Sequence, residues 1–483
     1  MKQKNWVKII KPIFIILLII STIPSIIYLV QNKTILNFDK YFTILFNDTD
    51  KLEQTLIYII ILAIITTLYV LILKNRDKIF KNIKQVYIFI AISATICIFI
   101  IPFISSDIFY YLGIGRLDSR YGQNPYYTTI TEFVENEDNE KYLENDTTLA
   151  AGYSNPWSDT TVVYGPIWTL ICKIVAGMSF GNIDIGLLLF KILAVLAHIL
   201  NCYIIYKLTK KKIFVLLYGL NPFILLEGIV NVHNDMYIIT FVLASIYFLI
   251  KKKNILASII FLALSTSIKY FTILLLPFII IYHFRDKNPL ERFKNCIIYG
   301  IIFALIMVIP YLLYIQDWTV LMGIFTQQEK FAKNFYIILM EYFPTIPELV
   351  TTVNKTLLGA FVIIYLFTCI TLINKKQVKF GKEIRKCEYF LIAFLFLLIT
   401  NFQPWYIMWL FPLLMWQKAK DIKLITQISI ISQFANSIFM INGEGWQNGT
   451  PFTFFMLLGF CVCLLNIGKK GHFKLRKELK ENS

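Results

Sequence analysis

Long apolar runs recur from one end of the chain to the other, and they are the feature that most constrains its fold. Each run holds about 17 to 25 residues, which is the length of helix that crosses the hydrocarbon core of a bilayer. The chain has no succession of ten-residue segments with alternating polarity, the pattern of an outer-membrane barrel. The sequence therefore predicts an all-α, polytopic integral membrane protein.

The composition of the chain agrees with a membrane location. Of its 483 residues, 57% are hydrophobic and only 16% are charged, whereas soluble domains are about 45–50% apolar and about 25% charged. No internal repeat and no soluble domain interrupts the apolar runs. We therefore expect residues 1–483 to form a single transmembrane domain in the cell membrane.

Lysine-rich patches between the apolar runs predict the topology. Cytoplasmic loops carry an excess of Lys and Arg, so we place "MKQKNWVKIIK", "KNRDKIFKNIK" and the tail "KKGHFKLRKELK" inside. The net charge of +17 is explained by these patches, and we expect no nucleic-acid partner. About 13–14 transmembrane helices follow, near 9–30, 54–73, 86–104, 184–207, 213–230, 233–250, 254–267, 268–284, 296–315, 356–373, 388–401, 404–417, 423–441 and 451–467. The short apolar piece 163–178 is read as a shallow or re-entrant element.

This topology collects the polar motifs of the chain on its outer side. The two largest outer segments are about 105–163 and 316–354. The motifs "SSD", "YGP", "NVHND", "STSIKY" and "NFQPWY" all fall at outer ends of apolar runs. Polar residues that only help helices to pack are expected on both sides of the membrane. Their convergence predicts a site on the extracytoplasmic face.

The first outer loop opens with "SSDIFYYLGIGRLDSRYG", in which apolar residues recur at helical spacing. This pattern predicts an amphipathic helix along the membrane interface. Asp107 at its start is either a helix cap or a carboxylate of the site. Arg116 either binds a substrate or meets lipid phosphates.

Two lysines lie within apolar sequence. Lys269 stands between "FLALSTSI" and "YFTILLLPFII", and Lys191 lies in "LLLFKILAVL". A lysine costs about 2.5–3.5 kcal/mol at the middle of a spanning helix and less near its end. Either lysine is a functional cation or extends its ammonium group to the interface.

The stretch "EGIVNVHND" concentrates Glu227, Asn231, His233, Asn234 and Asp235 at an outer helix junction. Such a cluster is either a set of helix caps or part of a site, and five polar residues beside the interface favour a site. The chain has no HExxH and no paired histidine spacing, so we expect no metal ion. It also lacks the GxGxxG and Walker loops of nucleotide sites, and its cysteines lie mostly in apolar runs, so neither cofactor nor disulfide framework is expected.

These motifs together resemble the GT-C superfamily of polytopic membrane glycosyltransferases, and within it bacterial polyprenol-phosphate-mannose-dependent mannosyltransferases. The resemblance is carried by "SSDIFYYLGIGRLDSRYGQNPY", "VYGPIW", "LNPFILLEGIVNVHND" and "STSIKYFTILLLP", and it spans about Ser105 to Pro277. It implies a polyprenyl-phosphate-linked hexose as donor and an inverting transfer on the extracytoplasmic face. The acceptor is a glycan, a lipid or another cell-envelope component.

The resemblance also implies roles for individual residues. Asp107 becomes the general base, and because its neighbour is Ser106 instead of a second acidic residue, we expect a metal-independent reaction. Transfer from a sugar phosphate also needs cations beside the leaving group. We assign Lys269, His233 and Arg116 to that phosphate. The substrate-binding candidates are Asn234, Asp235, Glu227 and three aromatic residues that are also typical of interfacial belts: Tyr164, Trp405 and Tyr406.

Two other functions use similar residues. A flippase or transporter for a lipid-linked sugar needs charges near the bilayer midplane and commonly shows repeats, neither of which the sequence displays. A glycan polymerase or ligase with a lipid diphosphate donor needs the same base and cations. The sequence separates this last alternative from a hexosyltransferase only weakly.

Overall fold

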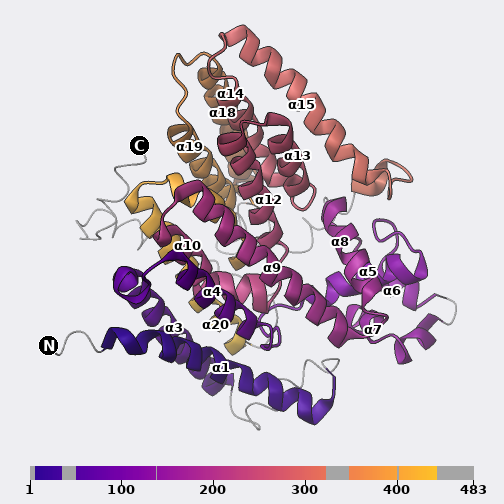
Figure 1. Cartoon of the computed structure of the whole chain (residues 1–483). Helices are drawn as coiled ribbons and strands as arrows, with labels where there is room; N and C mark the ends of the chain where they lie inside the picture. The colour runs from indigo at the N-terminus through magenta and orange to yellow at the C-terminus, as the bar shows by residue number, and fades with distance from the viewer. Residues whose placement is uncertain (1–5, 35–50, 137–138, 322–346, 400–401, 443–483) are drawn as a thin grey trace. The chain divides into compact units, whose positions relative to one another are not determined.

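The computed structural model describes residues 6–34, 51–136, 139–321, 347–399 and 402–442. Throughout these residues all regular secondary structure is helical, and no strand forms (Figure 1). The prediction of an all-α protein is confirmed.

Five of the helices are long and apolar enough to cross a membrane. They are α1 (Trp6–Asn32), α3 (Lys51–Ile79), α9 (Ile183–Thr209), α15 (Pro289–Tyr311) and α18 (Pro347–Ile373). A sixth span is formed if α10 (Lys212–Gly219) is counted with the segment Pro222–Val230, against which it is bent by 51°. The protein is therefore polytopic, as the sequence predicts.

Several of the other expected crossings coincide with apolar helices that are shorter than a span. These are α4 (Ile83–Cys97), α13 (Ile255–Thr266) and the pair η5 (Tyr270–Leu275) and α14 (Leu276–His283). The piece expected to be shallow or re-entrant coincides with α8 (Pro166–Met178), which is also an apolar helix shorter than a span. The crossing expected at 451–467 lies outside the described residues. A total of 13–14 crossings therefore stays a prediction.

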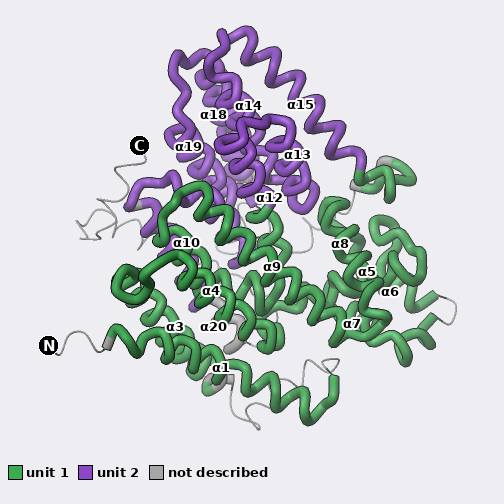
Figure 2. Tube along the Cα trace, in the orientation of Figure 1, with its two compact units in different colours: residues 1–240, 310–327 green, residues 241–309, 328–483 purple. Residues whose placement is uncertain are grey.

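The chain packs as two compact units (Figure 2). Unit 1 comprises residues 1–240 and 310–327, and unit 2 comprises residues 241–309 and 328–483. Unit 1 also contains α5 (Asp107–Tyr121), α6 (Ile130–Val134), η2 (Asn139–Glu144), α7 (Thr147–Tyr153), α11 (Pro222–Leu225), η3 (Leu226–Val230) and η6 (Trp318–Leu321). Helix α12 (Asp235–Tyr247) starts in unit 1 and continues into unit 2, which also contains η4 (Phe248–Lys252), α19 (Phe380–Ala393), η7 (Phe394–Leu398), η8 (Pro404–Trp416) and α20 (Ala419–Asn442).

The first large outer segment forms a helical assembly within unit 1, where α5 packs against α7 and α8 (Figure 1). Glycines allow these helices to approach closely: a Cβ added at Gly113 would lie 2.6 Å from the Cα of Gly152, and one at Gly115 would overlap the backbone of Cys172. Residues from Ile108 to Leu117 are almost all buried. Helix α5 forms where the sequence predicts it, but it is packed more completely than an amphipathic helix with one wet face.

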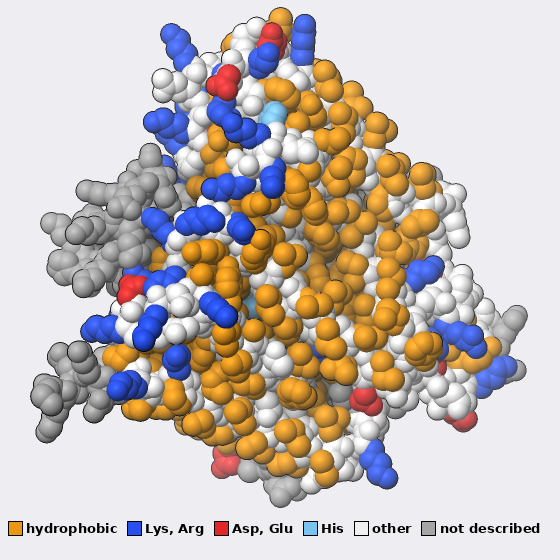
Figure 3. Space-filling view, viewed as in Figure 1, with side chains coloured by type: hydrophobic (Ala, Val, Ile, Leu, Met, Phe, Trp, Pro, Cys, Tyr) orange, Lys and Arg blue, Asp and Glu red, His pale blue; other side chains and the backbone are white. Residues whose placement is uncertain are grey.

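Hydrophobic side chains cover much of the surface in view (Figure 3). In unit 2, Ile301 of α15 is 55% exposed and Ile363 of α18 is 68% exposed. Exposed aliphatic faces on helices of spanning length are the property of lipid-facing helices. The second expected outer segment, 316–354, lies largely outside the described residues.

Candidate functional site

His233 lies between two carboxylates in unit 1. Its Nδ1 atom is 3.5 Å from Oδ2 of Asp107, and its Nε2 atom is 3.3 Å from Oε2 of Glu227. The same Glu227 oxygen accepts a hydrogen bond of 2.8 Å from the side chain of Asn231. We refer to Asp107, Glu227, Asn231 and His233 as the carboxylate–histidine cluster.

A broken helix brings Glu227 and His233 together. Helix α11 begins at Pro222, and the Asn221 side chain caps its N-terminus. The helix continues as the π-helix η3, which carries Glu227. The backbone N–H of Asn231 donates to the carbonyl oxygen of Leu226 at 2.9 Å. The backbone N–H of His233 donates to the carbonyl oxygen of Glu227 at 3.0 Å. Short π-helices occur frequently at functional sites.

The turn that carries His233 contains a strained residue. Val232 has a φ of 55°, in the left-handed region that a β-branched residue avoids at a cost of about 1–3 kcal/mol. Such strain persists only where the surrounding structure holds the backbone in place. The conformation of Val232 in turn sets the direction of the His233 side chain. The sequence gives no sign of it.

Lys191 of α9 stabilises this turn through hydrogen bonds to backbone carbonyl oxygens. Its ammonium group donates to the carbonyl oxygens of Ile100 at 2.6 Å and Val230 at 3.0 Å, and the side chain is 2% exposed. Val230 is the last residue of η3, where intrahelical donors are missing, and Ile100 lies three residues beyond the end of α4. The ammonium group therefore binds backbone at a helix junction and does not extend to the interface.

The charges around His233 decide its protonation. Burial by itself lowers the pKa of His233, but its interactions with Asp107 and Glu227 raise it more, so the pKa lies above the ordinary value of 6.5. An imidazolium between two carboxylates is also the arrangement in which each charge has an opposite neighbour. These interactions extend the pH range over which His233 is protonated to higher pH than for an ordinary histidine.

Asp107 is the member of this cluster whose side chain is partly exposed at the protein surface. Its side chain is 15% exposed, whereas those of His233 and Glu227 are fully buried. Its Oδ2 atom accepts a hydrogen bond of 3.3 Å from the Tyr111 hydroxyl. Ser106 holds the N-cap position of α5 without a side-chain cap bond. The carboxylate is thus directed at Tyr111 and His233, which does not support the alternative that it serves as a helix cap.

Aromatic rings surround Tyr111, the hydrogen-bond donor to Asp107, and some polar atoms of this region are unpaired. The ring of Tyr111 lies 5.5 Å from that of Tyr164 and 5.0 Å from that of Trp168, which is in turn 5.2 Å from Tyr237. Within the described part of the chain, the Trp168 indole N–H, the Tyr237 hydroxyl and both amide atoms of Asn234 are buried without a hydrogen-bond partner. Trp168 and Tyr237 were not among the sequence candidates, although Trp168 ends the quoted "VYGPIW".

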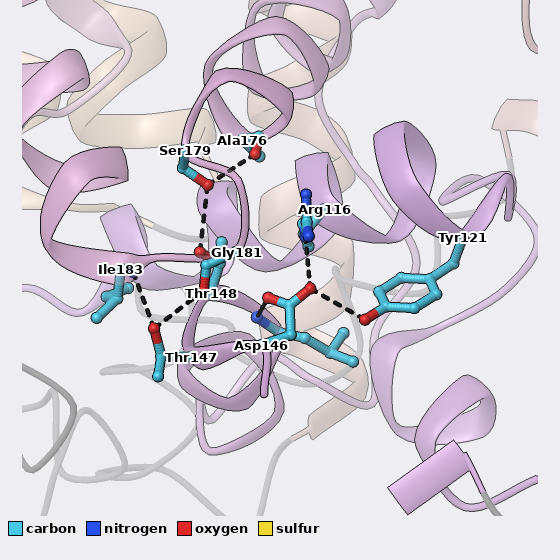
Figure 4. Close-up of polar contacts among 10 residues, drawn as sticks. Arg116, Tyr121, Asp146, Thr147, Thr148, Ala176, Ser179, Gly181 and Ile183 are labelled. Carbon is cyan, nitrogen blue, oxygen red and sulfur yellow. Dashed lines mark hydrogen bonds and ion pairs between the residues drawn. The ribbon is translucent and has the colours of Figure 1, made fainter. Parts of the chain in front are cut away.

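Arg116 lies in a different polar group, at the far end of α5 (Figure 4). Its Nε atom is 2.5 Å from Oδ2 of Asp146, which also accepts a hydrogen bond of 2.9 Å from Tyr121. The other Asp146 oxygen caps α7 by accepting from the N–H of Leu149. Nine residues separate Arg116 from Asp107, about 14 Å along a helix. Arg116 therefore joins α5 to α7, and the structure does not bring it to Asp107.

In unit 2 the motifs "STSIKY" and "NFQPWY" meet. The ammonium group of Lys269 lies 4.4 Å from the ring centroid of Tyr406 and 5.6 Å from that of Trp409. The rings of Phe271 and Tyr406 stack on Trp409, at 3.5 and 4.5 Å. We call Lys269, Phe271, Tyr406 and Trp409 the lysine–aromatic cluster. Trp405 is buried, with its ring 6.1 Å from that of Tyr406.

Apart from Arg116, the predicted site residues thus lie in two groups. Unit 1 contains Asp107, Glu227, His233, Asn234, Asp235 and Tyr164, and unit 2 contains Lys269, Trp405 and Tyr406. Asn234 and Asp235 are fully buried, and Asp235 begins α12. Among the described residues, no three His, Cys, Asp or Glu side chains are grouped so as to hold a metal ion.

The polytopic, all-helical fold, with a first large polar segment that starts at Asp107, agrees with a GT-C-like membrane glycosyltransferase. The chain belongs to the family described as alpha-(1->6)-mannopyranosyltransferase, N-terminal domain, whose model matches residues 14–285. The match includes the whole carboxylate–histidine cluster and Lys269, and it ends before Trp405 and Tyr406.

Two curated proteins are similar to part of the chain. One is alpha-(1->6)-mannopyranosyltransferase A of Corynebacterium glutamicum, 24% identical over 206 residues, which are 41% of this chain and 39% of that protein. The other is alpha-(1->6)-mannopyranosyltransferase A of Mycobacterium tuberculosis, 26% identical over 204 residues, 40% of this chain and 37% of that protein. The similarity thus covers less than half of either relative. No solved structure matches the chain significantly.

Proposed function

We propose that this protein is a membrane mannosyltransferase. It transfers a mannose-like hexose from a polyprenyl-phosphate donor to a hydroxyl group of a glycan, lipid or cell-envelope acceptor. The family and the names of the two relatives support mannose as the transferred sugar and a 6-hydroxyl as the acceptor group. Membrane helices that can hold a polyprenyl chain in the bilayer support a lipid-linked donor.

The observation that carries the proposal is the setting of Asp107. It is the partly exposed carboxylate of an otherwise buried polar cluster, and it lies beside aromatic rings suited to a sugar. In the reaction, Asp107 takes the proton of the acceptor hydroxyl while the acceptor oxygen bonds to the anomeric carbon. The bond from that carbon to the phosphate oxygen breaks, and polyprenyl phosphate leaves with the electron pair. A single displacement of this kind inverts the anomeric centre.

We assign the leaving phosphate to Lys269. An ammonium group over the faces of Tyr406 and Trp409 is attracted to both rings, which holds a cation in place with about 0.5–2 kcal/mol. The other two phosphate candidates are less suited, because both ring nitrogens of His233 face carboxylates and Arg116 is paired with Asp146. Tyr406 and Trp405 then remain candidates for contact with the donor.

The transferred sugar and its acceptor are assigned to the region around Asn234. Its buried amide has hydrogen-bonding groups without partners, and such groups are costly unless a ligand or water satisfies them. Asp235 follows directly, and Tyr164 offers a half-buried ring next to Tyr111. Glu227 lies behind His233, so its role is to support the site and not to touch the sugar.

The proposed site acts on the extracytoplasmic face, as the distribution of lysine patches predicts. Ser106 is next to Asp107 and partly exposed, so a Ser106→Cys variant reports the side of the site. We expect it to react with an impermeant thiol reagent on intact cells. Reaction only after lysis places the site inside and removes this part of the proposal.

The full chain purified in detergent tests the activity. Polyprenyl-phosphate mannose is supplied with octyl α-mannoside, without added metal, and the products are polyprenyl phosphate and a dimannoside. Other polyprenyl-phosphate hexoses are tested one at a time. If none is consumed while the protein moves the same lipids across vesicle membranes, the protein is a flippase and not a transferase.

A further inference from the structure

His233 has no ring nitrogen turned toward a substrate. Nδ1 faces Asp107 of α5 and Nε2 faces Glu227 of η3, both within 3.5 Å, and the ring is fully buried. A phosphate ligand needs an N–H that points at the substrate. The arrangement resembles instead a support for the one carboxylate of the cluster that is exposed.

We propose that His233 is a positioning residue: as a buried cation braced by Glu227, it holds the Asp107 carboxylate in the orientation that accepts the acceptor's proton. The inference rests on the proposed transferase function and concerns the same site. In this role His233 contacts Asp107 and does not bind the donor phosphate or the sugar.

The geometry explains how this works. The contacts of Asp107 with His233 and with Tyr111 both reach Oδ2, so Oδ1 is the oxygen that receives the proton. Two partners on one oxygen fix the rotamer of a short side chain, and a small misplacement of a catalytic group is costly in rate. The strained Val232 and the Lys191 ammonium hold the turn from which His233 projects.

The surrounding charges favour a charged imidazole. Without a cation, Asp107 and Glu227 are two carboxylates facing one ring in a buried site, and like charges there repel strongly. Other ionisable groups on the packed elements include Tyr110 and Tyr111 of α5, Asp235 and Tyr237 of α12 and Lys191 of α9. Tyr111 donates to Asp107, and Lys191 is bound to the carbonyls of Ile100 and Val230.

The pH dependence follows from this charge. His233 neither gains nor loses a proton during transfer, because the acceptor's proton goes to Asp107. The imidazolium is present below the folded-state pKa of His233, which is raised above 6.5 by Asp107 and Glu227 despite burial. As the pH rises through that value the support is lost, so turnover should fall on the alkaline side.

Three variants of the full chain test the proposal in the polyprenyl phosphate release assay with octyl α-mannoside. His233→Gln should lower kcat about 10²-fold with little change in the KM for the donor, and its alkaline decline should disappear. His233→Lys should recover part of kcat, and its decline should move to higher pH because an ammonium group keeps its proton longer. Glu227→Gln should shift the decline to lower pH.

His198→Gln is the matched control. His198 is also fully buried in unit 1, but its Nε2 lies 3.0 Å from the carbonyl oxygen of Gly219 and not beside a carboxylate. It should keep the parent's pH profile. Size-exclusion chromatography and thermal unfolding of each variant separate loss of fold from loss of rate.

Histidine NMR of the labelled full chain measures the charge independently of activity. The His233 signal is identified as the one that is absent from the His233→Gln spectrum and shifted in the Glu227→Gln spectrum. In the parent protein this signal should titrate above pH 6.5. A His233 signal that titrates below 6.5, an unchanged kcat in His233→Gln, or a higher donor KM with unchanged kcat would each overturn the inference. The last result restores His233 as a phosphate ligand. An inactive parent whose His233 titrates as expected contradicts the transferase proposal instead.

Discussion

The two polar clusters of the protein are built in opposite ways. The carboxylate–histidine cluster of unit 1 sets charges against one another on a π-helix and a strained turn, within a buried site. The lysine–aromatic cluster of unit 2 holds one cation against stacked rings. Under the proposed function, the first construction orients the proton acceptor and the second holds the cation that binds the leaving phosphate. The comparison therefore assigns the base and the phosphate roles to different parts of this chain.

The largest effect is expected from Asp107→Asn. The amide keeps the shape of the carboxylate but cannot take the acceptor's proton, so kcat should fall by about 10³-fold or more while donor binding is retained. Steady-state release of polyprenyl phosphate and a donor-binding assay measure the two quantities. Asp118→Asn is the control on the same helix, since Asp118 pairs with Lys173 and accepts from Tyr314. Near-parental turnover of Asp107→Asn would remove the base from our account.

The next effect is expected from Lys269→Met. If the ammonium group binds the phosphate as negative charge develops on it, both donor affinity and kcat should fall, the latter about 10²-fold. Lys269→Arg should recover only part, because a planar guanidinium does not occupy the same point as an ammonium group. Parental kinetics in Lys269→Met would mean that the lysine only extends toward the interface.

Arg116→Gln should affect stability and not chemistry. The Arg116–Asp146 pair is nearly buried, and loss of a hydrogen bond to a charged partner costs about 1.5–3 kcal/mol. Thermal unfolding in detergent should show a lower Tm, while kcat per folded molecule and its pH profile stay close to the parent's. A raised donor KM with an unchanged Tm would instead support the original assignment of Arg116 to the phosphate.

The smallest effect is expected from Asn234→Ala. If the amide contacts a sugar hydroxyl, its loss should raise the KM for octyl α-mannoside or for the donor about tenfold, the equivalent of one hydrogen bond. Because the amide atoms have no protein partner, the Tm should fall little. A large drop in Tm without a change in KM would show that Asn234 serves the fold.

Local pattern was enough to predict the fold class and to select most of the residues from which the site is proposed. Helical periodicity and lysine patches predicted an all-α membrane protein, and the polar motifs at helix ends pointed to Asp107, to "NVHND" and to Lys269 with "NFQPWY". These features follow from the cost of polar groups in lipid, which acts on each segment separately.

Pairings over long sequence separations were beyond the sequence. Arg116 is assigned to a phosphate from the sequence, because nothing near it identifies Asp146, 30 residues later, as its partner. His233 looked like a phosphate ligand, because Asp107 is 126 residues earlier and only the fold directs both carboxylates at one ring. The positive φ of Val232 depends on how the turn is held and not on the preference of valine.

Chemical rescue tests the central claim most directly. Azide is a nucleophile without a proton to lose, so transfer to azide needs no base but still needs stabilisation of the leaving phosphate. With polyprenyl-phosphate mannose, we predict that azide restores polyprenyl phosphate release and forms mannosyl azide with the Asp107→Asn variant, and that it fails to restore the Lys269→Met variant. Failure to rescue Asp107→Asn, or equal rescue of both variants, would contradict the assignment of the base to one cluster and the phosphate to the other.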